Sequence, residues 1–277
     1  MIPFIKTHAL GNDFLLVERK PDSPQDYAGL ARRICHRQFG IGADGLILWN
    51  RDHDRFHLRI FNQDGSEAEC SGNGLRCVAA YLIESGTWTK QEICLETVSG
   101  LYMLCRVREG GHEYEADMGT PALEPERIPF APPTPMERVV NYPMRVNDHT
   151  VSITACSTGN PHCSLFVDRL DDAFHQTVGP LLEKHPVFPN RTNVEFIHVL
   201  DDRNIEVAFW ERGVGTTYAS GTGSCGATVA CILNSKTGRS VTVHTKAGSL
   251  QVEWPENGHL KLTSTANIVA EGMYLES

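Results

Sequence analysis

The sequence has no run of basic residues, and this absence bears first on its partners. Lys and Arg total 25 against 34 Asp and Glu in 277 residues, which gives a formal net charge of −9 at pH 7. Proteins that bind nucleic acids neutralise phosphate groups with a positively charged surface. We therefore expect no nucleic acid partner.

Long apolar stretches are also missing. No segment comes near the roughly 20 consecutive apolar residues that a membrane helix needs, and we expect no signal peptide. The nine cysteines are odd in number and irregularly spaced, which is not typical of a disulfide framework. We expect no membrane partner and a cytoplasmic protein whose thiols are reduced.

What the sequence does contain is an internal repeat. Residues 71–82 read SGNGLRCVAAYL and residues 220–231 read SGTGSCGATVAC, an offset of 149. Chance similarity between glycine-rich turns would explain one such pair, but five pairs occur in the same order. The other four pairs, at offsets of 148 or 149, are Gly11-Asn12 with Gly159-Asn160, Asp44 with Asn193, Asn62 with Glu211, and Val98-Ser99-Gly100 with Lys246-Ala247-Gly248.

The repeat predicts two pseudo-symmetric domains, residues 1–118 with about 266–277 and residues 119–265. Each half has many strand-like segments and one segment, 73–84 or 223–234, that is apolar on most of its circumference. Such a helix is buried inside a sheet, so the predicted fold class is α+β. Two more helices are predicted, from the N-cap pair Ser23-Pro24 to about Arg37 and over 173–185. The predicted strands are 2–6, 14–18, 45–49, 56–61, 92–96, 102–107, a segment near 151, 163–168, 194–199, 205–210, 241–245, 250–254, 260–263 and 268–274.

Both repeated turns open directly into a helix-like segment. The first N–H groups of a helix have no partner within it and attract anions. The turns at Ser71 and Ser220 could therefore hold one carboxylate from two sides.

Three other chemistries fit these motifs less well. Residues Gly221 to Gly226 match G-x-G-x-x-G, but no strand precedes them and no acidic residue follows about 20 positions on, so no nicotinamide cofactor is expected. The two repeat serines do not lie in a G-x-S-x-G motif, which argues against a hydrolase. Cys156, His162 and Cys163 lack the spacing of a zinc site, so no metal is expected.

Six further motifs occur in a fixed order along the chain. They are THALGNDF at 7–14, GADG at 42–45, FNQDGS at 61–66, GNPHC at 159–163, TNVEF at 192–196 and ERGVG at 211–215. Together they resemble the diaminopimelate epimerases, amino-acid epimerases of lysine and cell-wall biosynthesis that need no pyridoxal phosphate. The resemblance implies two similar domains, each a mixed sheet wrapped around a central helix. It also implies an amino-acid substrate, no cofactor, and the ability to form a homodimer.

The resemblance implies a role for each motif residue. In the family two cysteines, each just before a glycine-rich turn, act on opposite faces of the α-carbon, and their positions here hold Ser71 and Ser220. His162 and Glu211 match the groups that exchange protons with these thiols. The matching substrate-binding residues are Gly72, Asn73, Gly221 and Thr222 as a cradle for the α-carboxylate, and Asn12, Asn62, Asn160, Asn193, Glu211 and Arg212 for the rest of the molecule.

The chemistry of these residues allows plainer roles as well. Arg212 suits a carboxylate because its guanidinium is planar, bidentate and permanently charged. Asn12 and Asn62, however, would also suit turn caps, and His162 would suit a buried core position.

Serine at both catalytic positions is the main departure from the family. A thiol titrates near about 8.5 whereas a hydroxyl is far harder to ionise, and Cys70 and Cys225 do not stand at the family's cysteine positions. Three interpretations are open: an engineered pair of substitutions, a natural Ser/Ser relative acting on diaminopimelate or another amino acid, and a binding protein without catalysis. We favour the second, because Thr216 and Tyr218 also depart from the family. A serine can act when a base such as His162 takes its proton.

Overall fold

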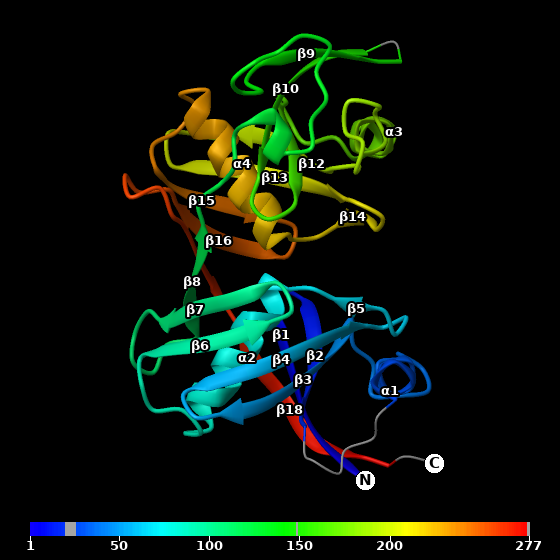
Figure 1. Cartoon of the computed structure of the whole chain (residues 1–277), viewed down its shortest axis with the longest axis vertical. Coiled ribbons are helices and arrows are strands. Elements are labelled where there is room, and N and C mark those ends of the chain that lie inside the picture. The colour runs from blue at the N-terminus through cyan, green and yellow to red at the C-terminus, as the bar shows by residue number, and fades with distance from the viewer. Residues whose placement is uncertain (20–25, 148, 276–277) are drawn as a thin grey trace. The chain divides into compact units, whose positions relative to one another are not determined.

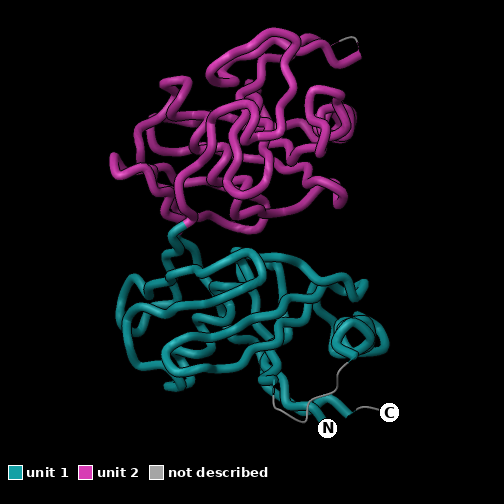
Figure 2. Tube along the Cα trace, viewed as in Figure 1, with its two compact units in different colours: residues 1–117, 263–277 teal, residues 118–262 magenta. Residues whose placement is uncertain are grey.

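The computed structural model describes residues 1–19, 26–147 and 149–275 of the chain. They form two compact units, which Figure 2 shows in different colours. Unit 1 consists of residues 1–117 and 263–277, and unit 2 consists of residues 118–262. Figure 1 labels the helices and most of the strands of both units.

Unit 1 is a mixed sheet with helices α1 (Tyr27–Ile34) and α2 (Gly72–Glu84). Strands β8 (Glu113–Gly119) and β17 (Leu260–Thr265) contain the two boundaries between the units. The other strands of unit 1 are β1 (Ile2–Ala9), β2 (Asn12–Glu18), β3 (Gly45–Asp52), β4 (Arg55–Asn62), β5 (Glu67–Ala68), β6 (Glu92–Thr97), β7 (Gly100–Arg106) and β18 (Asn267–Tyr274).

Unit 2 has the same composition of elements. Its helices are α3 (Asp172–Glu183) and α4 (Gly221–Leu233), and a short 3-10 turn spans Pro125–Arg127. Its strands are β9 (Tyr142–Val146), β10 (His149–Ser157), β11 (Pro161–Phe166), β12 (Asn193–Val199), β13 (Asn204–Glu211), β14 (Gly215–Thr217), β15 (Ser240–Thr245) and β16 (Gly248–Glu253).

The same succession of strand pairings occurs in both units. In unit 1, β1–β2 is antiparallel, β2–β3 is parallel across α1, β3–β4 is antiparallel, β4–β6 is parallel across α2, and β6–β7 is antiparallel. In unit 2 the matching pairs are β10–β11, β11–β12 across α3, β12–β13, β13–β15 across α4 and β15–β16, each with the same direction. The topology therefore repeats as the sequence motifs do.

The second helix of each unit is enclosed by its sheet (Figure 1). Helix α2 contacts β1, β2, β7 and β18, and α4 contacts β10, β11, β12, β13, β15 and β16. Nine consecutive residues of α4, from Gly223 to Cys231, are buried, so this helix has no solvent-facing side along that stretch. The structure confirms the α+β class and the central helices that the sequence predicted.

Strands β2 and β3 are buried on both faces, which explains their continuous apolar sequences. Leu15 and Leu46 pack in one cluster with Leu30 of α1. Because side chains alternate between the faces of a strand, Ile47 points the other way and lies beneath Gly74 of α2. The sheet of unit 1 thus separates an outer helix from an inner one.

Helix α1 is shorter than predicted. Its N-cap is Asp26, and the predicted start at Ser23-Pro24 lies outside the described residues. It ends at Ile34 rather than near Arg37, because the chain folds back and the N–H groups of residues 41 and 42 donate to the Ile34 carbonyl at 2.8 and 3.1 Å. Within the described ranges, none of the helices has the length and apolar character that crossing a membrane requires.

Candidate active site

The two repeated turns are the N-termini of α2 and α4, and a serine caps each helix. Ser71 Oγ accepts the N–H of Gly74 at 3.1 Å, and Ser220 Oγ accepts the N–H of Gly223 at 3.3 Å. Both serines have extended backbones, with φ of −144° and −138°, as N-cap residues usually do. Each oxygen is held by its helix, and each hydroxyl keeps its own proton to donate to another acceptor.

Each helix start lies directly against the sheet beneath it. A Cβ at Gly74 would lie 2.7 Å from Ile47 Cδ1, and one at Gly223 would lie 2.9 Å from Phe209 Cδ1. Glycine is therefore required at the third residue of both helices. The first turn of each helix presents N–H donors and the positive end of the helix dipole to an anion. The residues of these turns are Gly72 and Asn73 in unit 1, and Gly221 and Thr222 in unit 2.

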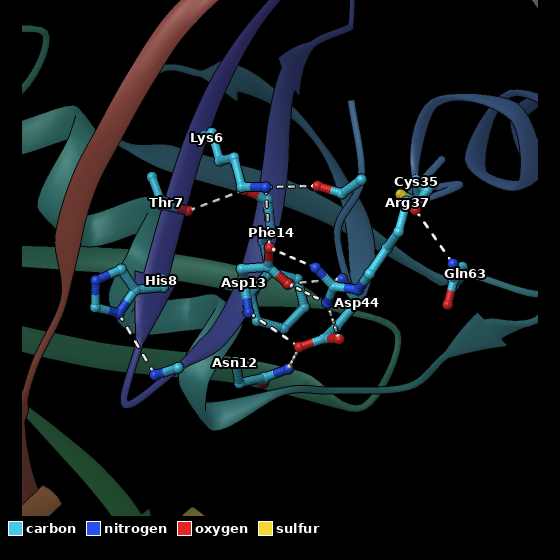
Figure 3. A network of polar contacts seen from close by, with 12 residues as sticks. Lys6, Thr7, His8, Asn12, Asp13, Phe14, Cys35, Arg37, Asp44 and Gln63 are labelled. Carbon is cyan, nitrogen blue, oxygen red and sulfur yellow. Dashed lines mark hydrogen bonds and ion pairs between the residues drawn. The ribbon is translucent and has the colours of Figure 1, made fainter. Parts of the chain in front are cut away.

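In unit 1, side-chain hydrogen bonds connect α2 to the turn between β1 and β2. Asn73 Nδ2 donates to Asn12 Oδ1 at 3.1 Å, and Asn12 Nδ2 donates to Asp44 Oδ2 at 2.8 Å, a contact drawn in Figure 3. At the other end, the buried guanidinium of Arg76 donates to Asn73 Oδ1. Because Arg only donates and an ionised carboxylate only accepts, both amides have a fixed orientation. The structure thus brings the predicted residues Asn12 and Asn73 together.

Asp44 is anchored by Arg37, which also binds Asp13 (Figure 3). One guanidinium nitrogen lies 2.6 Å from Asp44 Oδ1 and 2.9 Å from Asp13 Oδ1, and Lys6 Nζ lies 3.1 Å from Asp13 Oδ2. Burial raises the pKa of Asp13, but the hydrogen bonds from Arg37, Lys6 and the Asp44 backbone outweigh it and hold that pKa below its ordinary 3.8. Of these four residues, the repeat had singled out Asp44 through its match to Asn193.

Asn62 lies at the end of β4 and closes the turn that follows it. Its N–H donates to the Ser66 carbonyl at 2.8 Å, and its Nδ2 donates to Ser66 Oγ at 2.9 Å. The turn joins the site through the N–H of Gln63, which donates to the Asp44 carbonyl at 3.1 Å. No hydrogen bond among the described residues links the side chain of Asn62 to Asn12. Asn62 therefore caps a turn here, and its contact with a substrate stays a prediction.

In unit 2, a histidine and a carboxylate continue the corresponding chain. Asn160 Nδ2 donates to Thr222 Oγ1 at 3.4 Å, and Asn160 Oδ1 lies 2.8 Å from His162 Nε2. His162 Nδ1 lies 2.6 Å from Glu195 Oε1, and both side chains are buried. In the part of the chain that the structure describes, His162 forms no hydrogen bond to Ser220. Both ring nitrogens have partners here, and the expected role of His162 as the base for a serine stays a prediction.

Glu211 ends β13 and is partly buried. Its Oε1 accepts the hydroxyl of Thr217 at 2.6 Å. Burial raises the pKa of this carboxyl above its ordinary 4.5, and the opposing effects of Thr217 and of the nearby His162 are smaller. A carboxyl with a raised pKa holds a proton at a pH where an exposed one is ionised, which suits a group that exchanges protons with a substrate or a neighbouring hydroxyl.

Asn193 connects the start of β11 to the turn after β13, where Arg212 lies. Asn193 Nδ2 donates to the Pro161 carbonyl at 2.9 Å, and its Oδ1 accepts the N–H of Arg212 at 3.0 Å. The exposed guanidinium of Arg212 donates to the Asn190 carbonyl at 3.2 Å. Across the described residues it has no carboxylate partner, so its other donors are available to an acidic group of a ligand.

Neither neighbouring cysteine takes the place of a serine. Cys225 is fully buried within α4. Burial raises the pKa of the Cys70 thiol, and its hydrogen bonds to Tyr102 and Ser99 offset only part of that effect. A thiol with a raised pKa is a poor source of thiolate at neutral pH. The two hydroxyls are thus the groups that occupy the repeated helix caps.

The fold of the chain is shared with solved structures of distant sequence. A phenazine biosynthesis protein of the PhzF family from Bacillus anthracis has a TM-score of 0.71 at 16% identity, covering 100% of this chain and 99% of that chain. A hydroxyproline epimerase from Agrobacterium vitis, with bound trans-4-hydroxy-L-proline, has a TM-score of 0.69 at 15% identity, covering 100% and 93%. The chain has the fold of this class of epimerases and PhzF-family proteins.

Relatives of higher sequence identity show which family of this fold the chain belongs to. The sequence model of the family described as diaminopimelate epimerase matches residues 4–124 and 154–269. The diaminopimelate epimerases of Pelotomaculum thermopropionicum and Moorella thermoacetica are each 48% identical over 276 and 274 residues, covering 98% and 97% of this chain and 98% of their own. The chain belongs to the diaminopimelate epimerase family, as its motifs predicted.

Proposed function

We propose that the protein is a cofactor-independent amino-acid epimerase that converts LL- to meso-diaminopimelate in lysine biosynthesis. The observation that carries the proposal is a pair of serine-capped helix starts of the same construction. In each, an asparagine from a neighbouring hairpin bonds to the second helical residue, Asn12 to Asn73 and Asn160 to Thr222. The substrate is supported by relatives of 48% identity that are named diaminopimelate epimerases.

The substrate's α-carboxylate would bind to the N–H groups of the helix starts. The same dipoles would stabilise the negative charge that develops when the α-proton leaves. Inversion of a carbon needs one proton-transfer group for each face, and Ser71 and Ser220 are the equivalent pair. Arg212 would bind the distal carboxylate, for which its bidentate guanidinium is suited.

Serine sets a condition on the proton transfer. A hydroxyl is not ionised to a useful extent at neutral pH, so each serine must release its own proton to a base as it takes the α-proton. Unit 2 supplies acid–base groups for this task, namely Glu211 with its raised pKa and the ring of His162. Their role in exchanging protons with Ser220 is part of the proposal.

One observation favours a second candidate function, amino-acid binding without catalysis. Ser220 Oγ acts as a helix cap, and among the described residues it is hydrogen bonded to neither His162 nor Glu211. A protein that holds a diamino acid at the helix starts without moving its α-proton would have this geometry. The two candidates differ in a measurable property, the exchange of the α-hydrogen with solvent.

Incubation with LL-diaminopimelate in deuterium oxide tests the proposal. We expect deuterium at the α-carbon, measured by mass spectrometry, together with the appearance of the meso isomer. The variant Arg212→Lys keeps the charge but loses the bidentate geometry, so it should raise KM more than it lowers kcat. Calorimetric binding without exchange would favour the second candidate, and neither binding nor exchange would reject diaminopimelate as the ligand.

A further inference from the structure

Glu195 of unit 2 has a buried carboxylate that contacts His162, and the motifs assign it no role in substrate binding or proton transfer. Its Oε1 lies 2.6 Å from His162 Nδ1, and its Oε2 accepts the hydroxyl of Ser164 at 3.0 Å. All three side chains are at most 1% exposed. A charged carboxylate is stable in such a position only when it is paired and its oxygens are hydrogen bonded. Both oxygens of Glu195 meet this condition.

Strand register explains why these polar side chains meet. β11 and β12 are parallel, and Ser164 lies opposite Glu195. Side chains alternate between the two faces of a strand, so His162, Ser164 and Glu195 share the face covered by α4. There a Cβ at Gly226 would lie 2.9 Å from His162 Cβ and Cγ, so the helix fits directly over the ring. The intervening residues, Cys163, Leu165, Val194 and Phe196, form the apolar core against α3.

The hydrogen bonds assign the protons of the ring. An ionised carboxylate only accepts, so His162 Nδ1 carries a proton. Asn160 Oδ1 faces Nε2 at 2.8 Å while its NH2 faces the Thr222 hydroxyl; in this orientation Nε2 carries a proton and donates to Asn160, and because a hydroxyl also donates, the turned amide would fit a bare Nε2. Loss of the Nε2 proton would leave a lone pair facing an oxygen, so the Asn160 amide would turn and withdraw its NH2 from Thr222. The protonation of the ring is therefore coupled to the start of α4.

Four other titratable groups lie around this ring. Cys156 pairs with His162 across β10 and β11, and burial raises the pKa of its thiol and of Cys163 well above 9.0, so both stay neutral. The thiol of Cys225 is buried on α4. Glu211 is near enough for its charge to interact with the ring, but its carboxylate accepts the hydroxyl of Thr217. Of these groups and Glu195, only Glu195 is hydrogen bonded to Nδ1 within the described residues, so Glu195 determines where that proton lies.

We propose that Glu195 is a positioning residue for His162: it fixes a proton on Nδ1, so that the ring exchanges protons only at Nε2, towards Asn160 and Thr222. A buried imidazole can carry positive charge here because the carboxylate compensates it. The inference rests on the proposed function for the reaction that uses the ring. The arrangement of protons itself exists without substrate and can be measured without it.

Nitrogen-15 NMR of the histidine rings in the whole protein tests this arrangement. In the wild type we expect the Nδ1 signal of His162 to be that of a protonated nitrogen, because Nδ1 donates to Glu195. Glu195→Gln keeps the size of the side chain but removes its charge, so the preference for a proton on Nδ1 should be lost. A bare Nδ1 in the wild type, or an unchanged ring in the variant, would overturn the proposal. The internal reference is His175, which is also buried and whose Nε2 accepts the N–H of Asp171 at 3.3 Å; its signals should not change.

Exchange kinetics separate this inference from the proposed function. With a substrate whose α-proton the enzyme exchanges, Glu195→Gln should lower kcat at least about tenfold and change KM by less than about twofold. The pH at which kcat rises or falls should also shift. Ser164→Ala should have a smaller effect in the same direction, since it frees one carboxylate oxygen. Glu183→Gln removes another buried carboxylate, one that bonds Trp210, and should leave the pH profile and the His162 signals as in the wild type.

The two hypotheses can fail independently. A protein that exchanges no α-proton but shows a ring that responds to Glu195→Gln would reject the proposed reaction and retain the positioning role. A protein that exchanges the α-proton of diaminopimelate, but whose Glu195→Gln variant keeps the ring signals and pH profile of the wild type, would retain the proposed reaction and reject the positioning role.

Discussion

Replacing both serine caps with cysteine, Ser71→Cys together with Ser220→Cys, should raise the rate of α-proton exchange strongly. The change replaces one atom in each cap. The N–H groups of Gly74 and Gly223, at 3.1 and 3.3 Å from the present hydroxyl oxygens, remain to stabilise an anion on sulfur. Helix N-termini lower thiol pKa values for this reason. The variant therefore tests whether the missing acidity of the caps limits the reaction.

The size of the effect follows from the acidity of the two groups. A thiol has a pKa near about 8.5, whereas the pKa of a hydroxyl is far higher and close to that of water; the difference in acidity is worth about 10 kcal/mol. The helix dipole contributes about 0.3–2 kcal/mol to either anion and cannot close this gap. The oxygen anion is more basic and recovers about 0.4–0.5 of this difference, as in thiolate reactions. About 5–6 kcal/mol therefore remains in the barrier of the serine protein, and the cysteine variant should exchange roughly ten-thousandfold faster.

Deuterium uptake by LL-diaminopimelate, followed by mass spectrometry, measures this gain. Ser85→Cys is the matched control, because Ser85 is exposed at the opposite end of α2 and contacts the Leu82 carbonyl instead of the N-terminal turn; it should leave exchange unchanged. Each single variant should act on one face of the α-carbon. An uptake rate in the double variant equal to that of the wild type would refute the reasoning, since the caps would then not be the limiting groups.

The same double variant should be less stable than the wild type, although it is more active. Ser is among the best N-cap residues, and loss of such a cap costs about 1 kcal/mol for each helix. Thermal melts should therefore move opposite to activity. A variant that gained both would indicate that the caps contribute little to holding α2 and α4.

Three further outcomes are expected from single substitutions. The pKa of Glu211 is raised, so the folded state retains a proton that the unfolded chain loses above about pH 4.5. The free energy of unfolding therefore falls as pH rises from 4.5 through the pKa of the folded state. Glu211→Gln should raise Tm at pH 8 but not at pH 4. Asp13 has a lowered pKa, so its contribution is present above pH 3.8 and is lost as pH falls through its folded value; Asp13→Asn should cost about 1–3 kcal/mol in urea melts at pH 7 and much less at pH 2. Gly226→Ala should destabilise by about 1–3 kcal/mol because its Cβ would contact His162 at 2.9 Å. Gly72→Ala, whose Cβ would have its nearest neighbour at 3.8 Å, is the tolerated control, and equal melts for the two alanine variants would contradict this account.

The topology was predictable because the informative residues lie where elements begin and end. Ser71 and Ser220 cap helices, and Gly74 and Gly223 are required by contact with the sheet. Such positions accept few residue types, so the repeat survives there and can be recognised in one sequence. Helix α1 was predicted less well, because its end at Ile34 depends on tertiary contacts of residues 41 and 42 rather than on local signals.

The contacts within the site were not predictable in the same way. Glu195 is a single polar residue in an apolar strand, and its partner His162 lies 33 positions away. The contact depends on the parallel register of β11 and β12, which alternation alone does not fix. Likewise, Arg37 reaches Asp13 across 24 residues of sequence. Burial and register, rather than residue type, bring these groups together.

The two copies of the repeat carry different chemistry behind helix starts of the same shape. In unit 1 the hydrogen-bonded chain from Asn73 through Asn12 ends in carboxylates held by Arg37 and Lys6, residue types that do not ordinarily titrate near neutral pH. In unit 2 the hydrogen-bonded chain from Thr222 through Asn160 passes through His162 to Glu195, and histidine is the residue type that ordinarily titrates near neutral pH. The two units thus share the geometry of the helix starts, but only the helix start at Ser220 is connected by hydrogen bonds to a histidine, His162, among the described residues. An epimerase built on these two serines should therefore exchange the α-protons of its LL and meso substrates at unequal rates, and equal rates would mean that both hydroxyls exchange with solvent without help from the ring.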